Sequence, residues 1–322
     1  MKKNRILIAV CIGIVLLIIG WMLQSDPPKP ETVRFGYLPI ASDASFFVAV
    51  EQGYFANQGL QIEPVKFETS NQALEALSAG RIDATAPVAL ETALALEANT
   101  PNQFQIVEMT AATADTKVHR IMVKSDSKIQ SLADLRNKKI GTFPGTQMVV
   151  FLKLILGRYF DAEKEVEILQ LKQSLQPQAL ETSQIDAIFC LEPTCTQLEA
   201  NGLARSISIN PLYEYILQPF PTAATVISTE FGKQNPETIR KIIAALQLSH
   251  EFIKTQPQQA SLSVPKYAPI EAELAPKISL YDYWDVKSID RNAVQKLADF
   301  YASHGIITKQ IETNSLYWNQ DK

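Results

Sequence analysis

The sequence predicts an α/β fold made of two similar lobes, and three observations support this prediction. Signals for strands and helices alternate from position 33 to position 189. Such β-α-β order with short connections builds a mostly parallel sheet flanked by helices. The segment QALEALSAGRIDA at 72–84 has a shorter counterpart, QALETSQIDA, at 178–187. About 290 residues follow the N-terminal segment, which is enough for two lobes.

The counterpart segments also have a simple alternative explanation. Ala, Leu and Glu are common helix formers, and matches of this kind arise by chance. Both segments nevertheless fall at the same point of a β-α-β unit, with a helix, a turn and a strand in order. This shared position favours two related lobes.

The first set of elements begins after the N-terminal segment. Ala73, Leu74 and Leu77 have helical spacing, and Gly80 is well placed to end that helix. Strands are expected at 33–38, 61–67 and 82–86, and helices at 46–52, 71–77 and 91–98.

A second set begins after Thr116, and a third after Pro221. Pro236 can start a helix because the N–H that proline lacks has no partner at that position. Strands are expected at 120–123, 139–142, 166–171, 185–189 and 222–228, and helices at 146–160, 236–255, 258–267 and 290–304.

We expect the third set to return to the first lobe. Residues 32–115 and 222–322 would then form lobe 1, and residues 116–221 would form lobe 2. The chain would cross between the lobes near 114–118 and again near 218–222.

The N-terminus has the pattern of a membrane anchor. Lys2, Lys3 and Arg5 precede an apolar run at 6–23, which is long enough to cross the hydrocarbon core as a helix. The positive flank should stay cytoplasmic, so the rest of the chain would lie outside the cytoplasm, attached to the inner membrane.

A cleaved signal peptide is the alternative. Residues 24–26 make a poor cleavage site, and Cys11 lies too early in the apolar run for a lipoprotein signal. We therefore expect residues 1–25 to remain as an anchor. Residues 26–31 contain three prolines and would form a stiff linker.

Charge and cysteine content limit the possible partners. The net charge of −4 argues against a nucleic-acid partner, because binding to the phosphate backbone needs a basic face. Cys190 and Cys195 have a spacing that fits no common zinc site, and no histidine lies near them. We expect two buried or half-buried thiols, because a strand-to-helix corner often separates such side chains. A disulfide is the alternative that export would allow. Neither a metal nor a cofactor is expected.

Five segments occur in the order seen in periplasmic solute-binding proteins of ABC importers. They are VRFGYLP, FFVAVEQGYFANQGLQIEPVKF, EALSAGRIDA, SLADLRNKKIGTFPGT and IDAIFCLEPT. From about Thr32 to Phe231, the chain resembles the group that binds nitrate, sulfonates, taurine and the thiamine pyrimidine. The resemblance implies a type II periplasmic-binding-protein fold with two crossings between lobes. It also implies a clamp that closes on a small molecule and delivers it to an ABC permease with its ATPase. We expect the protein to be a monomer.

Candidate ligand contacts in lobe 1 follow from the α/β architecture. In open α/β sheets, ligands bind outside the carboxyl ends of strands, where helix N-termini present unpaired N–H groups. Ser42, Asp43 and Phe46 follow the first strand in this position, with Ser45 as the expected helix cap. Ordinary N-capping and a core position for Phe46 are the alternatives. The two later junctions of this lobe contribute Thr69, Ser70 and Val88.

The strongest candidate in lobe 2 is the loop that precedes its long helix. Gly145 would let the backbone approach a ligand closely, and Thr146 offers both a hydroxyl and an N–H group. A simple turn with a threonine cap is the alternative. By the family pattern, Glu192 lies at the cleft, where it would bind an amine or brace a loop. The full set in this lobe is Thr142, Pro144, Gly145, Thr146, Gln147 and Glu192.

The charges of these loops bear on the ligand. They contain no arginine or lysine, whereas Asp43 and Glu192 are acidic. A neutral or zwitterionic solute, such as an aminosulfonate or a pyrimidine, fits better than a bare oxyanion such as nitrate. Helix N–H groups alone can still hold an anion.

Two other functions were weighed against solute binding. Yeast synthases of the thiamine pyrimidine resemble this fold and depend on a histidine and a dense cysteine cluster. Here His119, His250 and His304 are scattered, and FCLEPTC lacks that cluster. A membrane-tethered ligand sensor is the other alternative, but the chain has no kinase or signalling module. We therefore expect a binding protein without catalytic residues.

Overall fold

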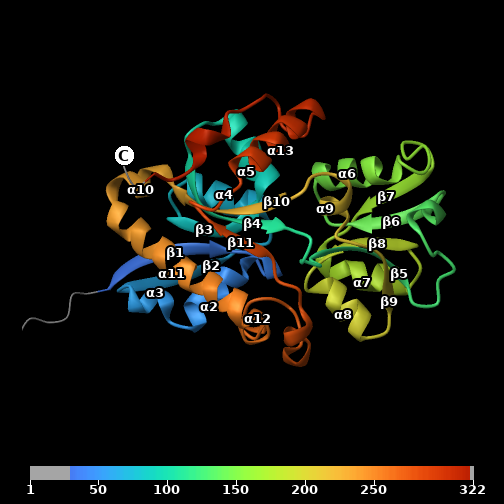
Figure 1. Ribbon diagram of the computed structural model, residues 1–322, viewed down its shortest axis with the longest axis horizontal. Helices are drawn as coiled ribbons and strands as arrows, with labels where there is room; N and C mark the ends of the chain where they lie inside the picture. The colour runs from blue at the N-terminus through green and yellow to red at the C-terminus, as the bar shows by residue number, and fades with distance from the viewer. Residues whose placement is uncertain (1–29, 320–322) are drawn as a thin grey trace, which may run out of the picture. The chain divides into compact units, whose positions relative to one another are not determined.

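The computed structural model describes residues 30–319, which form two β-sheets flanked by helices (Figure 1). The predicted anchor at residues 1–25 lies outside the described residues, as does most of the predicted linker. Within residues 30–319, no helix combines the length and the apolar character that a bilayer-spanning segment needs. The two-sheet α/β fold predicted from the sequence is confirmed.

The two sheets are formed by different parts of the chain. Sheet A has the order β11-β4-β10-β3-β1-β2, and sheet B has the order β7-β6-β8-β5-β9. The strands of sheet A are β1 (Glu31–Tyr37), β2 (Leu60–Lys66), β3 (Ala84–Ala89), β4 (Phe104–Ala112), β10 (Phe220–Ser228) and β11 (Asp282–Asp285). The strands of sheet B are β5 (His119–Lys124), β6 (Lys138–Thr142), β7 (Val166–Gln170), β8 (Ala187–Leu191) and β9 (Ala204–Ile209).

The chain crosses between the sheets twice, once from β4 to β5 and once from β9 to β10. The strand that follows each crossing runs against its neighbours: β5 is antiparallel to β8 and β9, and β10 is antiparallel to β3 and β4. By contrast, β1 pairs with β3, and β6 with β7 and β8, in parallel. Parallel pairing needs a crossover connection, usually a helix, and these pairs have one.

Helices cover both faces of each sheet. Around sheet A they are α2 (Ala44–Glu51), α3 (Tyr54–Asn57), α4 (Ser70–Ser78), α5 (Leu90–Asn99), α10 (Thr229–Gln234), α11 (Pro236–Thr255), α12 (Pro257–Ser261) and α13 (Arg291–Ser303). Around sheet B they are α6 (Thr146–Leu156), α7 (Gln176–Glu181), α8 (Thr194–Ala200) and α9 (Pro211–Tyr215). Short 3-10 turns are η1 (Ala41–Asp43), η2 (Leu132–Leu135), η3 (Gln173–Leu175), η4 (Val264–Lys266), η5 (Ala272–Lys277) and η6 (Thr313–Leu316).

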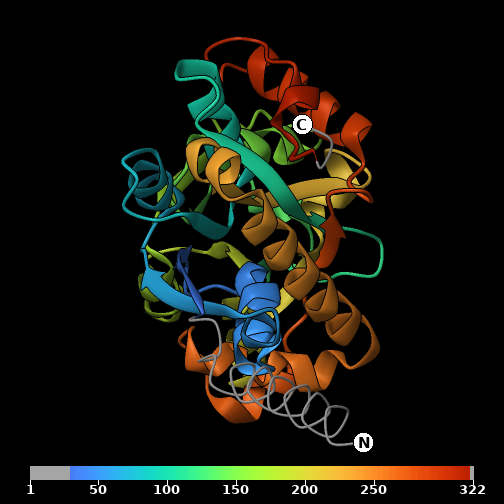
Figure 2. The same cartoon turned by 90° about the vertical axis from the view of Figure 1, so that its left-hand side faces the viewer.

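Apolar side chains explain how the helices pack. One face of sheet A, with Val33 and Phe35, is buried against α2, α3 and α11. The long α11, coloured orange, runs across this side in Figure 2. The other face packs against α4, α5 and α13, in a cluster that continues into sheet B. In this cluster the Phe151 ring of α6 lies 5.4 Å from the Phe220 ring and 5.9 Å from the Phe300 ring, centroid to centroid. The apolar core therefore joins the two sheets.

Some elements differ from their predicted form. Strand β4 was not predicted, because Glu108 interrupts its apolar pattern. In the structure Glu108 is fully buried and contacts His250 and Thr225. The helix expected at 258–267 divides into α12 and η4, because Pro265 cannot donate a helical hydrogen bond.

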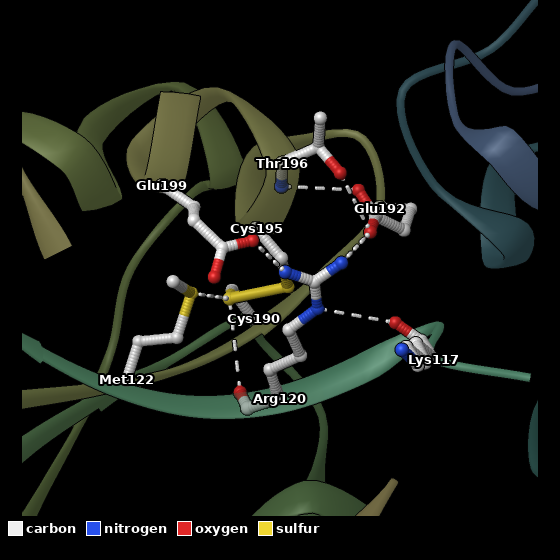
Figure 3. Close-up of a disulfide and its surroundings, with 8 residues drawn as sticks. All are labelled: Lys117, Arg120, Met122, Cys190, Glu192, Cys195, Thr196 and Glu199. Carbon is white, nitrogen blue, oxygen red and sulfur yellow. Dashed lines mark hydrogen bonds and ion pairs between the residues drawn. A yellow bond between two sulfur atoms is a disulfide. The ribbon is translucent and has the colours of Figure 1, made fainter. Parts of the chain in front are cut away.

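The prediction of two free thiols is wrong, because Cys190 and Cys195 form a disulfide (Figure 3). Cys190 lies in β8 and Cys195 lies in α8, and only four residues separate them. This tight corner brings their Cα atoms to 5.8 Å. That separation falls within the range of roughly 4.4–6.8 Å that disulfides require.

Candidate functional site

The candidate residues after β1 are buried and hold their own loop. Asp43 accepts hydrogen bonds from the Leu38 N–H at 2.8 Å and from the Ser42 hydroxyl at 2.9 Å. The Tyr283 hydroxyl donates to the Ser42 carbonyl at 3.0 Å. Burial raises the pKa of Asp43 well above its usual value, although both hydrogen bonds oppose this shift. Ser42 and Asp43 therefore fix the exit of β1 through contacts within the protein.

The cap predicted at Ser45 is wrong. Ser45 lies inside α2, and its buried hydroxyl has no hydrogen-bond partner within residues 30–319. The preceding 3-10 turn, η1, moves the helix start to Ala44, so that Ser45 is already past the capping position. Its carbonyl accepts a hydrogen bond from the Ser249 hydroxyl of α11 at 2.6 Å.

Two candidates, Phe46 and Val88, contribute to the core. The fully buried Phe46 ring stacks on the Phe35 ring, with centroids 4.7 Å apart. Val88 of β3 is also fully buried, in the cluster that contains Leu90. Of the two alternatives given for Phe46, the contacts favour the core position.

The candidates at the start of α4 have defined polar partners. Thr69 caps the helix, because its hydroxyl accepts from the Gln72 N–H at 3.3 Å. The Ser70 hydroxyl accepts from the Ala89 N–H at 3.0 Å and so connects α4 to the end of β3. These contacts place Ser70 at the carboxyl edge of sheet A.

In sheet B, the loop from β6 to α6 has an exposed helix start. Gly145 has φ +149°, and its N–H donates to the Gln170 side chain at 2.8 Å. Thr146 is exposed and begins α6, which has no side-chain cap from the described part of the chain. Pro144 is exposed and Gln147 is half-buried, whereas Thr142 is fully buried at the end of β6. The N–H groups at the start of α6 are therefore free of any side-chain cap.

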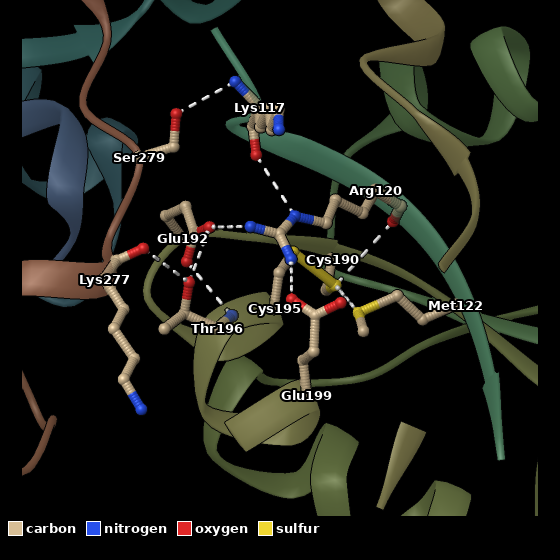
Figure 4. A network of polar contacts seen from close by, with 10 residues as sticks. All are labelled: Lys117, Arg120, Met122, Cys190, Glu192, Cys195, Thr196, Glu199, Lys277 and Ser279. Atoms are coloured by element: carbon tan, nitrogen blue, oxygen red, sulfur yellow. Dashed lines mark hydrogen bonds and ion pairs between the residues drawn. A yellow bond between two sulfur atoms is a disulfide. The ribbon is translucent and has the colours of Figure 1, made fainter. Parts of the chain in front are cut away.

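Glu192 is almost fully buried after β8 and is surrounded by donors (Figure 4). Its Oε1 accepts from Arg120 Nη2 at 2.8 Å and from the Thr196 hydroxyl at 2.9 Å, and its Oε2 accepts from the Thr196 N–H at 3.1 Å. Arg120 also donates to Glu199 at 2.7 Å and to the Lys117 carbonyl at 3.3 Å. Of the two roles considered for Glu192, these contacts favour that of a brace.

The electrostatics of Glu192 are dominated by burial. Burial raises the pKa of Glu192 to about 7, while the Arg120 guanidinium and the Thr196 hydrogen bonds act in the opposite direction. The backbone N–H of Ser279 also lowers this pKa. The carboxyl group thus titrates near neutral pH.

A segment that the sequence reading did not identify lies beside Glu192. This connecting segment, residues 277–281, joins η5 to β11 of sheet A. The Ser279 hydroxyl accepts from the Lys117 N–H at 2.9 Å, and the Lys277 carbonyl accepts from the Thr196 hydroxyl at 3.5 Å (Figure 4). The alternation in ISLYDYWD at 278–285 is the sequence signal of a strand that could have indicated it.

Tyr281 of the connecting segment is buried, and the carboxyl groups of Asp43 and Glu192 both influence its pKa. Burial raises the pKa of the Tyr281 phenol, and the carboxyl groups of Glu192 and Asp43 both add to this effect. Two predicted site residues from different sheets therefore act on one side chain. Tyr281 also contacts the His119 ring edge to face, with centroids 5.8 Å apart.

His119 begins β5, directly after the first crossing, and is buried. Burial lowers the pKa of His119 to about 4, and the Asn210 side chain opposes this shift. Neither Nδ1 of His119 nor Oδ1 of Asn210 has a hydrogen-bond partner within the described part of the chain. His119 was not among the ligand contacts predicted from the sequence.

The Thr142 hydroxyl is another buried polar group without a hydrogen-bond partner in the described part of the chain, and strand register places it on the same face of sheet B as His119. Thr142 pairs with Phe189, and Phe189 pairs with Ile121, so these side chains lie side by side. His119, two residues before Ile121, lies on that face too, with its ring 6.4 Å from the Phe189 ring. The Thr142 hydroxyl is buried and, within residues 30–319, has no hydrogen-bond partner.

Residues 30–319 contain no group of three or more His, Cys, Asp or Glu side chains that could hold a metal ion.

The chain is similar to a known protein family and to known binding proteins. Residues 41–260 match the family described as NMT1/THI5 like. A provisionally named aliphatic sulfonates-binding protein of Bacillus subtilis (strain 168) is 22% identical over 337 residues, covering 99% of this chain and 95% of its own.

Two solved structures of binding proteins share the fold. The periplasmic aliphatic sulphonate binding protein SsuA from Escherichia coli has a TM-score of 0.74 and 17% identity, covering 90% of this chain and 98% of its own. The alkanesulfonate-binding protein SsuA from Xanthomonas axonopodis pv. citri, bound to MOPS, has a TM-score of 0.72 and 18% identity, covering 91% and 99%. At this level of identity, the similarity establishes the fold of the chain.

Proposed function

The chain belongs to the NMT1/THI5-like family, and from this membership we propose that it is the substrate-binding component of an ABC importer. It captures a small organic solute between its two sheets and delivers it to a membrane permease with its ATPase. The single observation that carries the proposal is that Asp43, after β1, and Glu192, after β8, both raise the pKa of the buried Tyr281, although they belong to two sheets joined by two crossings. The fold shared with solved sulfonate-binding proteins supports it.

The proposed mechanism is a ligand-driven closure of the two lobes. A protein that samples open and closed forms shifts toward closure when a ligand contacts both lobes. Ser70 at the edge of sheet A and Thr146 at the start of α6 are the proposed contacts from the two sides. The two crossings, at 113–118 and 210–219, are short enough to act as hinges. The permease would recognise the closed form.

The proposed ligand is neutral or zwitterionic, such as a taurine-like aminosulfonate or a pyrimidine. Arg120 is a buried cation near the junction of the sheets, and Glu192 and Glu199 already engage it. An anionic group on the ligand would instead be held by the N–H groups at the start of α6.

We place the protein outside the cytoplasm, with residues 1–25 as its attachment to the inner membrane. The Cys190–Cys195 disulfide supports export, because disulfides persist in oxidising compartments. Detection of residues 1–25 in the protein isolated from membranes would establish the anchor, and its absence from the mature protein would indicate cleavage.

We propose binding without turnover. Two of the three histidines have structural partners: His250 contacts the buried Glu108, and His304 contacts the Phe300 carbonyl. The third, His119, lies beside Tyr281 and Asn210 rather than beside a cysteine cluster.

A thermal-shift screen of the chain from Glu31 onward tests the proposal. The ligands would be taurine, alkanesulfonates, nitrate and aminopyrimidines. A ligand at a concentration of 100 times its Kd stabilises the folded state by about 2.7 kcal/mol. For a chain of this size, each kcal/mol raises the Tm by roughly 2–4 °C. No shift with any class would contradict the proposal, and conversion of a ligand to product would favour an enzyme.

A further inference from the structure

We propose that His119 determines ligand specificity, because Asn210 holds it in the Nδ1–H tautomer and leaves Nε2 as a hydrogen-bond acceptor for the ligand. This inference rests on the proposed function, and it deepens that function by naming the ligand chemistry. The selected ligand carries an N–H or O–H donor at the end that meets His119.

The orientation of the Asn210 amide is set by its donors. Nδ2 of Asn210 donates to the Thr113 carbonyl at 2.7 Å and to the Thr116 hydroxyl at 3.2 Å. The remaining atom, Oδ1, can only accept a hydrogen bond. It is buried and, among residues 30–319, has no donor. Asn210 therefore needs a donor from a neighbouring group.

His119 is that neighbour. The backbone N–H of Asn210 donates to the His119 carbonyl at 2.7 Å, so the two residues face each other across β5 and β9. The buried Nδ1 atom of His119 also has no hydrogen-bond partner in the described part of the chain. A buried polar group without a partner costs about 1–3 kcal/mol. A proton on Nδ1 would allow one hydrogen bond to Oδ1 that satisfies both atoms, and the Asn210 side chain does act on the pKa of His119. A proton on Nε2 would leave two acceptors, Nδ1 and Oδ1, without a donor.

The tautomer determines what the other side of the ring offers. A neutral imidazole with its proton on Nδ1 has a lone pair on Nε2 and no donor there. Nε2 makes no hydrogen bond within residues 30–319, and unlike Nδ1 it is not fully enclosed by protein atoms. The ring therefore carries an unpaired acceptor beside Tyr281 of the connecting segment.

The surroundings of the ring disfavour an anionic partner. Tyr281 contacts the ring edge to face, and the carboxyl groups of Glu192 and Asp43 act on Tyr281. Arg120 lies on the other face of β5 and is engaged by Glu192 and Glu199. A neutral or cationic donor group on the ligand matches this environment, whereas a sulfonate or carboxylate does not.

Nitrogen NMR on the full-length chain tests the tautomer without any ligand. The protein has three histidines, so labelling with ¹⁵N-histidine gives few signals, and their loss in His119→Gln assigns those of His119. We expect the Nδ1–H pattern at pH 7. In Asn210→Asp, the added carboxylate should raise the pKa of His119, because an opposite charge stabilises the imidazolium. A pattern with the proton on Nε2, or an imidazolium at pH 7, would overturn the proposal.

Matched ligands test the specificity. Taurine differs from propane-1-sulfonate by an ammonium group in place of a methyl group, and 4-aminopyrimidine differs from 4-methylpyrimidine by its amino group. In calorimetry, we expect the donor-bearing member of at least one pair to bind about tenfold tighter, which corresponds to about one good hydrogen bond. His119→Phe should abolish this preference, His119→Gln should retain part of it, and the exposed control His304→Gln should leave it unchanged.

The outcomes separate the two proposals. Binding of both members of a pair with equal affinity, or an unchanged preference in His119→Phe, would overturn the role of His119 while leaving solute binding intact. If none of the four probes binds, the proposed role of His119 in specificity is overturned. The proposed function is overturned as well if the thermal-shift screen also finds no ligand. The tautomer is decided by the NMR pattern in either case.

Discussion

Ser279 accepts a hydrogen bond from the backbone N–H of Lys117 at 2.9 Å, and this contact joins the connecting segment to the first crossing. Lys117 lies two residues before β5, and Ser279 lies three residues before β11 of sheet A. Besides the two chain crossings, this hydrogen bond is thus a noncovalent link between the parts of the chain that form the two sheets.

Removal of this link should have a modest effect. We expect Ser279→Ala to lower the free energy of unfolding by about 0.5–1.5 kcal/mol, the usual net value of one hydrogen bond. Urea denaturation of the variant measures this change. The exposed Ser303→Ala, which removes a bond to the Phe300 carbonyl within α13, serves as a control for loss of a hydroxyl. A larger effect at Ser303 than at Ser279 would contradict the importance of the link.

Thr146→Ala should weaken ligand binding about tenfold while the fold stays intact. Thr146 is exposed at the start of α6, and within residues 30–319 its hydroxyl makes no hydrogen bond that caps the helix, so the substitution should leave the helix start unchanged. Calorimetry with a ligand from the screen gives the affinity, and thermal unfolding gives the stability. Thr182→Ala, at the end of α7, is the matched control. Equal affinities for Thr146→Ala and the native protein would remove this loop from the site.

Arg120→Met should destabilise the protein strongly. At pH 8, above the Glu192 pKa of about 7, its loss leaves an ionised Glu192 buried without its cationic partner, and breaking a buried pair in this way costs about 3–5 kcal/mol. Adding Glu192→Gln should recover a large part of this loss, because no buried charge then remains. A double-mutant cycle in urea measures the coupling. If the loss of unfolding free energy in the double variant equals the sum of the losses in the two single variants, the two side chains are not coupled.

Glu192 should make stability depend on pH. Burial raises its pKa to about 7 from the ordinary 4.5, so the folded state binds a proton more tightly than the unfolded state. Its stabilising contribution is therefore fully present below pH 4.5 and is lost as the pH rises through 7. We expect the stability difference between the native protein and Glu192→Gln to change over this window in urea denaturation. A difference that is constant from pH 4 to pH 8 would contradict the assignment.

Reduction of the Cys190–Cys195 disulfide should lower stability by about 2 kcal/mol, as expected for a short closed loop in the chain-entropy description. Urea denaturation with and without dithiothreitol measures the loss, and mass spectrometry verifies reduction. Cys190→Ser with Cys195→Ser should be insensitive to the reductant. If the native protein is equally insensitive, the disulfide contributes nothing to stability.

The sequence by itself determined the α/β class and most of the strands and helices, because each of these depends on neighbours within a few positions. The periodic apolar residues of α4 and the proline at the start of α11 are signals of this local kind.

Only the tertiary structure decided which distant polar groups meet. Glu108 contacts His250 from α11, and Arg120 contacts Glu192 across 72 positions of the chain. The connecting segment reaches Lys117 from 162 positions away, and the disulfide depends on the angle between β8 and α8. A buried polar residue takes its partner from whatever element packs beside it, and local sequence does not specify that element.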